Sequence, residues 1–160
     1  MIEPGWLIQA RTWLGTREIP GPRHNPVILG WLHRLRAWWA DDEVPWCGTF
    51  VAACMDAVGV PLPKHWMRAR AWLDWGVPLP LPLIGCVVVF ERQGGGHVGF
   101  VVGRNERGHL LVLGGNQGDA VTIAAFDRPP LGFRWPAGEP MPMRNAELPV
   151  GQAARSTSEA

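Results

Sequence analysis

The sequence predicts an α+β domain, in which short helices come first and a small antiparallel β-sheet follows. Two observations support this fold class. Apolar residues recur at helical spacing up to about residue 75, and short apolar runs separated by glycine and polar residues follow from about residue 86. The length of 160 residues fits a single domain that buries a core of its own.

Four segments of the first half have helical periodicity, and each has a boundary signal. Three of them end at Gly15, Gly59 and Gly76, where glycine can take the left-handed conformation of a helix cap. The remaining one begins at Asn25-Pro26, a capping side chain followed by a residue suited to the first turn. The predicted helices cover residues 6–14, 26–38, 47–58 and 64–75.

Strand-like runs follow three prolines, Pro78, Pro80 and Pro82, which we expect to interrupt any regular element. Glycine and polar residues separate the runs, as an antiparallel meander requires. The predicted strands cover residues 86–90, 97–103, 109–113 and 120–126, with 132–135 as a last edge strand. We therefore expect one domain over residues 1–136 and, from its Pro, Ser, Ala and Glu content, a poorly ordered tail over 137–160.

The composition argues against several classes of protein. The net charge is +1 and the arginines are scattered, so no nucleic-acid-binding surface is indicated. No apolar run approaches the roughly twenty residues of a membrane span. Three cysteines without a C-x-x-C pair favour reduced thiols over a disulfide framework or a zinc site. We expect a monomer without a metal or cofactor.

Ten tryptophans and no tyrosine make the aromatic content unusual. We expect most of these rings to fill the core. The clusters Trp38-Trp39 and Trp72/Trp75 are candidates for exposed rings that stack on a sugar or a peptide.

Cys47 lies in the first turn of the third predicted helix, directly after an extended, proline-containing stretch that ends in Trp46. Backbone N–H groups are free in this turn, and the positive end of the helix dipole stabilises a thiolate there. The same region, with Trp46 and Gly48, is the candidate oxyanion and substrate-binding site. Cys54 and Cys86 are expected in the core, and a buried structural role is the alternative for Cys47 as well.

His97 lies in the most strongly patterned predicted strand, and Asn116 follows the next strand in Gly114-Gly115-Asn116-Gln117. One hairpin separates them, so the amide of Asn116 can lie beside the imidazole and fix its tautomer. Gln117, also a candidate substrate-binding residue, and Asp119 are the substitutes for Asn116. A structural histidine and plain turn chemistry are the alternatives. A helix-start cysteine, a strand histidine and an amide, in this order, are typical of a papain-like thiol hydrolase.

Other chemistries have weaker support in the sequence. Zinc ligands at recognisable spacing, such as H-E-x-x-H, are not found. Asp41, Asp42 and Glu43 could bind a cation, but acidic residues ahead of a helix are favoured by its dipole alone. The glycines of residues 93–96 precede a strand and do not form a phosphate-binding loop.

Four motifs together resemble the NlpC/P60–CHAP superfamily of bacterial and phage cell-wall hydrolases. In chain order they are Leu-Gly-Thr-Arg-Glu-Ile-Pro-Gly at 14–21, Asp-Glu-Val-Pro-Trp-Cys-Gly-Thr-Phe-Val at 42–51, Gly-His-Val-Gly-Phe at 96–100 and Leu-Gly-Gly-Asn-Gln at 113–117. The resemblance runs from about Trp6 to Trp135. It implies a papain-like fold, with Cys47 as nucleophile, His97 as base and Asn116 as the orienting third residue.

The resemblance also implies a function, cleavage of an amide bond in or next to the stem peptide of peptidoglycan. The start of the chain lacks a basic leader followed by an apolar stretch. We therefore expect synthesis in the cytoplasm and action on the wall, in the periplasm, after release through a holin or a secretion system. A phage endolysin fits this expectation. The alternatives are a non-catalytic wall-binding or phage structural protein and an antibacterial effector with the same chemistry.

Overall fold

The structure, a computed structural model, describes residues 3–41, 44–142 and 147–156. Within these residues, the helical elements come first and six strands follow, as the sequence predicts. The helical elements are α1 (Gly5–Thr12), α2 (Pro26–Arg34), α3 (Cys47–Ala57) and the 3-10 helix η1 (Ala69–Asp74). The strands are β1 (Val77–Leu79), β2 (Val87–Arg92), β3 (Gly95–Arg104), β4 (Leu110–Gly114), β5 (Thr122–Phe126) and β6 (Gly132–Trp135).

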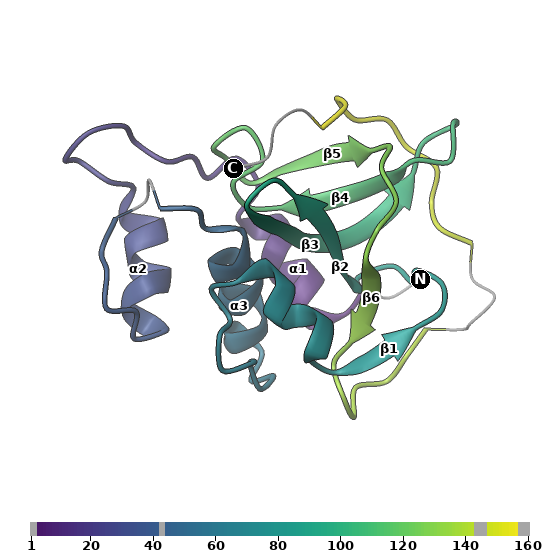
Figure 1. Cartoon of the computed structure of the whole chain (residues 1–160), viewed down its shortest axis with the longest axis horizontal. Coiled ribbons are helices and arrows are strands. Elements are labelled where there is room, and N and C mark those ends of the chain that lie inside the picture. Colours follow the sequence, from purple (N-terminus) through teal and green to yellow (C-terminus); the bar gives the residue numbers. More distant parts are fainter. Residues whose placement is uncertain (1–2, 42–43, 143–146, 157–160) are drawn as a thin grey trace.

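Helix α3 is the central helix, because residues 47–55 are all buried. On one side the ring of Phe50 contacts Phe100 of β3, with centroids 6.2 Å apart, and on the other it lies 5.6 Å from Trp31 of α2. Trp13, at the end of α1, joins the same cluster at 4.9 Å from Trp31. Figure 1 shows α3 between the sheet and α2, which lies at the periphery. The start of α3 is therefore held firmly against β3.

The sheet is antiparallel, with the strand order β1-β6-β2-β3-β4-β5 in the described part of the chain. The predicted meander is confirmed as β2 to β5. The last strand, β6, is not at the edge as predicted, because it lies between β2 and the short strand β1. The sequence analysis misses β1 because it contains Pro78, which an edge strand tolerates.

The sheet curls strongly across its width. The rings of Phe90 on β2 and Phe126 on β5 stack at 4.5 Å, although two strands lie between β2 and β5 in the sheet order. Successive side chains on a strand point to opposite faces. Phe100 of β3 faces α3, whereas His97 stacks on Phe126 at 5.5 Å, inside the curl. One face of β3 therefore packs on α3, and the opposite face carries His97.

Two predicted helices differ from the observed ones. The segment 64–75 is helical only as η1, because Arg68 has an extended backbone (φ −98°, ψ 123°) that interrupts it. Helix α2 begins as predicted, with the Asn25 side chain accepting a hydrogen bond from the N–H of Val27, but it ends at Arg34. Arg36, just beyond, has a left-handed backbone with φ 59°. None of the helices in the described ranges is long and apolar enough to span a bilayer.

Part of the predicted tail is packed on the sheet. The backbone N–H of Arg104 donates to Pro149 at 2.9 Å, and that of Ala125 donates to Ala154 at 2.9 Å. Leu148 is buried. Residues 147–156 thus pair with backbone groups of β3 and β5 that the neighbouring strands leave free, and the poor order expected for the tail stays a prediction. Residues 143–146 and 157–160 of the predicted tail lie outside the described residues.

Candidate active site

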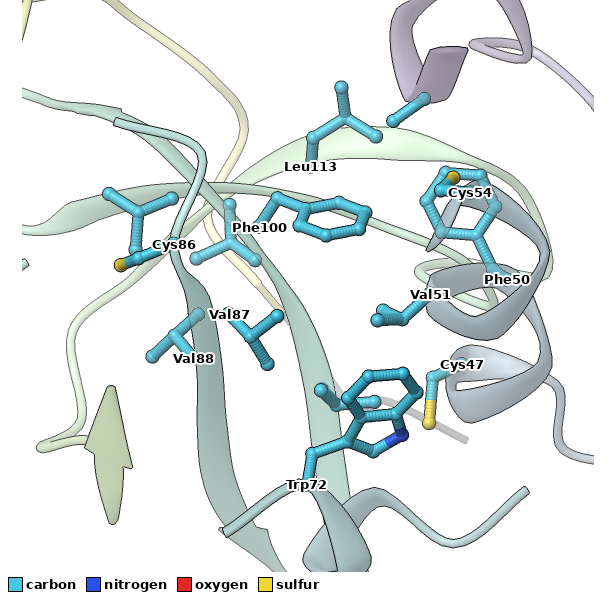
Figure 2. Packing of buried hydrophobic residues seen from close by; sticks show 14 of the residues in the cluster. Cys47, Phe50, Val51, Cys54, Trp72, Cys86, Val87, Val88, Phe100 and Leu113 are labelled. Carbon is cyan, nitrogen blue, oxygen red and sulfur yellow. The ribbon is translucent and has the colours of Figure 1, made fainter. Parts of the chain in front are cut away.

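Cys47 is the first residue of α3, as predicted, and its side chain is only 5% exposed. Trp46 precedes it as the N-cap residue, with a non-helical backbone and no capping hydrogen bond from its side chain. The N–H groups of this first turn have no carbonyl partner within the helix, so they can interact with the thiol or its substrate. Figure 2 shows Cys47 at the start of α3, Cys54 farther along the helix and Cys86 beside Val88.

Two opposing influences act on the pKa of the Cys47 thiol. Burial raises the pKa of its thiol, whereas a hydrogen bond from the backbone of Val98, the positive charge of Arg92 and the backbone N–H groups of Gly48 and Cys47 itself lower that pKa. The net direction is upward, so the thiol is protonated at pH 7. Three backbone groups and the charge of Arg92 therefore favour the thiolate without outweighing the effect of burial.

His97 is completely buried on the inner face of the curled sheet. Its Nε2 lies 2.9 Å from Oε1 of Gln117. Its Nδ1 has no hydrogen-bond partner among the residues that the structure describes. Burial lowers the pKa of the imidazole to about 4, with Arg128 and Arg92 acting in the same direction and the Gln117 hydrogen bond opposing them. The imidazole is therefore neutral at pH 7.

The amide of Gln117 determines which nitrogen of His97 carries the proton. Its Nε2 donates to the carbonyl of Val112 at 3.2 Å and to the carbonyl of Thr122 at 2.9 Å. The amide oxygen therefore faces the imidazole and must accept a hydrogen bond from it. The proton of neutral His97 is then on Nε2, and Nδ1 presents an unprotonated lone pair. A lone pair of this kind is what a general base needs.

Asn116 does not make the contact predicted for it. The hydrogen bond to His97 comes from Gln117, which the sequence analysis names as a substitute. Asn116 is buried and has a left-handed backbone with φ 59°, so the chain turns at this residue before Gln117 reaches the imidazole. A methyl group at Gly114 would clash with the amide oxygen of Gln117 and lie 3.3 Å from Nε2 of His97. A glycine at position 114 thus leaves room for the His97–Gln117 pair.

The structure brings the backbone of β3 next to Cys47, whereas the imidazole of His97 lies on the face of β3 opposite the one that packs on α3. The sulfur of Cys47 interacts with the backbone of Val98, the residue that follows His97. No hydrogen bond links the sulfur to Nδ1, which has no partner in the described part of the chain. Hydrogen bonds within catalytic pairs are often formed only when substrate is bound.

Trp46 and Gly48, two of the predicted substrate-binding residues, are packed into the protein at the start of α3. Trp46 is 1% exposed, and its indole N–H donates to Glu18 at 3.1 Å. A Cβ at Gly48 would lie 2.5 Å from the carbonyl oxygen of Trp66, so close packing requires glycine there. What these two residues offer the site is the backbone at the start of α3.

A cavity of about 320 Å³ opens beside Cys47. Arg68, Arg70 and Arg92 contribute to its wall. Sequence reasoning missed these arginines because they come from separate segments, the stretch before η1, η1 itself and the β2–β3 hairpin. The Arg-x-Arg pattern at 68–70 is the sequence feature that could have indicated a cationic wall. Asp42 and Glu43, considered above as cation ligands together with Asp41, lie outside the described residues.

Part of the chain matches a known protein family. Residues 39–116 match the family described as the CHAP domain, and this range includes Cys47 and His97 and ends at Asn116. No protein with a curated description matches the chain.

Proposed function

Residues 39–116 belong to a CHAP domain of the NlpC/P60–CHAP superfamily of cell-wall hydrolases, and from this premise we propose that Cys47 cleaves an amide bond in or next to the stem peptide of peptidoglycan. CHAP domains are typically cysteine- and histidine-dependent amidases or peptidases, and membership implies peptidoglycan as substrate. The observation that carries the assignment is the His97–Gln117 pair. It leaves an unprotonated Nδ1 on the residue next to Val98, which contacts the sulfur of Cys47.

The proposed reaction starts from a neutral thiol and a neutral imidazole. As the sulfur of Cys47 bonds to the carbonyl carbon, its proton passes to Nδ1 of His97, a step that requires the imidazole to turn from the inner face of the sheet towards α3. The carbonyl electrons move to the oxygen, which faces the free N–H groups of the first turn of α3. The C–N bond then breaks, and the leaving amine takes the proton from His97. Water attacks the thioester, releasing the carboxylic acid and restoring the thiol.

The assignment is tested with purified sacculi and the release of soluble muropeptides. Wild type is expected to release them, and Cys47→Ala is expected to lose at least a thousandfold in rate. Cys54→Ala is the matched control, because it removes a thiol from the same helix away from the cavity. Equal release by wild type and Cys47→Ala would overturn the role of Cys47. Mass spectrometry of the products identifies the bond.

A wall-binding protein without catalysis is the second candidate. The observation in its favour is that Cys47 and His97 are both neutral and are not hydrogen-bonded to each other. It predicts that wild type and Cys47→Ala bind sacculi equally and that neither releases fragments.

For the biological setting we favour phage lysis, with the enzyme reaching the wall through a holin. This rests on the superfamily resemblance alone. An antibacterial effector would use the same chemistry. A neighbouring holin gene supports lysis, whereas a neighbouring gene whose product neutralises the enzyme supports the effector.

A further inference from the structure

We propose that Trp38 is a platform for a sugar ring of the glycan strand, at the outer end of a groove that leads to Cys47. This inference rests on the proposed function, since it assigns a second part of the same substrate. It starts from two neighbouring hollows of about 320 and about 430 Å³. The first contains Cys47, the second contains Trp38 and Trp39, and both are lined by Pro45, Met67 and Arg68. Because they share these three wall residues, the two hollows are adjacent, and we take them together as the groove.

Trp38 is exposed to an extent that its environment in the fold does not explain. Its side chain is 91% exposed, whereas Trp72 and Trp75, the other predicted exposed pair, are buried. An exposed indole next to a catalytic groove offers a flat apolar surface with a polar edge. The apolar face of a pyranose ring can stack on such a surface.

A row of aromatic rings connects Trp38 to the core. Trp38 contacts Trp39 edge to face at 5.3 Å, and Trp39 stacks on Trp66 at 5.9 Å. Trp66 is 9% exposed, and its carbonyl accepts a hydrogen bond from the indole of Trp72 at 3.0 Å. Trp38 therefore meets this row through one edge-to-face contact and leaves most of its surface open to a sugar.

The same contacts fix the platform relative to the nucleophile. Gly48, next to Cys47, packs so closely on the backbone of Trp66 and Met67 that a side chain would not fit. The start of α3 and the base of the aromatic row are therefore one rigid unit. A substrate seated on Trp38 enters the Cys47 cavity from a defined direction.

The charge distribution along the groove favours a substrate whose peptide lies at the Cys47 end and whose sugar lies at the Trp38 end. Three arginines, Arg68, Arg70 and Arg92, line the Cys47 end, and the Trp38 end shares only Arg68 of the three. A stem peptide carries carboxylates, whereas the sugar backbone is largely uncharged. The cationic end suits the peptide, and the aromatic end suits the glycan.

The experiment compares Trp38→Ala with wild type on two soluble substrates, a disaccharide-linked stem peptide and the same peptide without sugar. The ratio of kcat/KM for the linked over the sugar-free substrate is expected to fall about tenfold, through KM. Leu81→Ala is the control, because Leu81 is 70% exposed and lies in a different hollow. An unchanged ratio in Trp38→Ala would overturn the platform.

A binding measurement separates this proposal from the catalytic one. Cys47→Ala and the double variant Cys47→Ala/Trp38→Ala are titrated with the linked and the sugar-free peptide by calorimetry. Tighter binding of the linked peptide that disappears with Trp38 supports the platform, even if wild type cleaves neither substrate. Equal affinity of both ligands for both variants refutes it, even if wild type cleaves both.

Discussion

The first and the middle turns of α3 carry the same residue type in different surroundings. Cys47 and Cys54 are both buried, and burial raises the pKa of both thiols. At Cys47 the backbone of Val98, Arg92 and the N–H groups of the first turn oppose this rise, whereas for Cys54 burial is the cause that the structure gives. The comparison teaches that burial does not separate a nucleophile from a core cysteine, and that donors available to the sulfur do.

The largest difference is expected in alkylation of the two thiols. Iodoacetamide should modify Cys47 on the order of a thousandfold faster than Cys54, because Cys47 borders a cavity and has groups that oppose the rise in its pKa, whereas burial is the cause given for Cys54. Mass spectrometry of peptides after timed exposure measures both rates in one sample. Similar rates at the two residues would remove the basis of the comparison.

The neutral state of His97 predicts a pH dependence of stability. The imidazole pKa is 6.5 in the unfolded chain and about 4 in the fold, so below pH 6.5 the unfolded state binds the proton first. Stability is therefore highest above pH 6.5 and falls as the pH drops towards 4, by about 3 kcal/mol from this residue. Urea unfolding at several pH values measures it. His97→Gln should have a shallower slope over this range, and an unchanged slope would contradict the assignment.

Gln117 and Asn116 should differ in their effect on catalysis. Gln117→Ala is expected to lower kcat on the order of tenfold to a hundredfold, because the imidazole loses the acceptor that fixes its tautomer. Asn116→Ala is the matched control and should lower kcat less. Initial rates of muropeptide release measure both. A larger loss in Asn116→Ala would restore Asn116 to the role that the sequence suggested.

The smallest effect is expected at Cys54. Cys54→Ala removes one buried sulfur and should lower the free energy of unfolding by about 1 kcal/mol, with little change in kcat. Chemical denaturation and activity are measured on the same preparation. A folded but inactive Cys54→Ala would mean that the functional thiol had been misassigned.

The sequence predicts the parts of the site that depend on local pattern. The helix start at Cys47, the meander and the strand with His97 follow from periodicity and boundary residues. The choice between Asn116 and Gln117 depends on a turn in which Asn116, Gly118 and Asp119 all have positive φ. Each left-handed residue changes the direction of the chain, so spacing alone does not tell which amide reaches the imidazole.

Long-range contacts account for the remaining differences between the predicted and the observed structure. Strand β1 forms only because β6 pairs with it, and Pro78 conceals it in the sequence. The segment 64–75 has helical periodicity, but Trp72 and Trp75 donate their indole hydrogens back to the carbonyls of Trp66 and Pro61, which favours a compact turn. The arginines beside Cys47 meet only through the fold.

The segment 147–156 has a consequence for handling the protein. By pairing with Arg104 and Ala125, it covers backbone groups that would otherwise invite another polypeptide to add a strand. A version cut after residue 136 would keep Cys47, His97 and Gln117 but would expose the unpaired edge of β5. Such a version would be prone to self-association, and a poor yield from it would say nothing about catalysis.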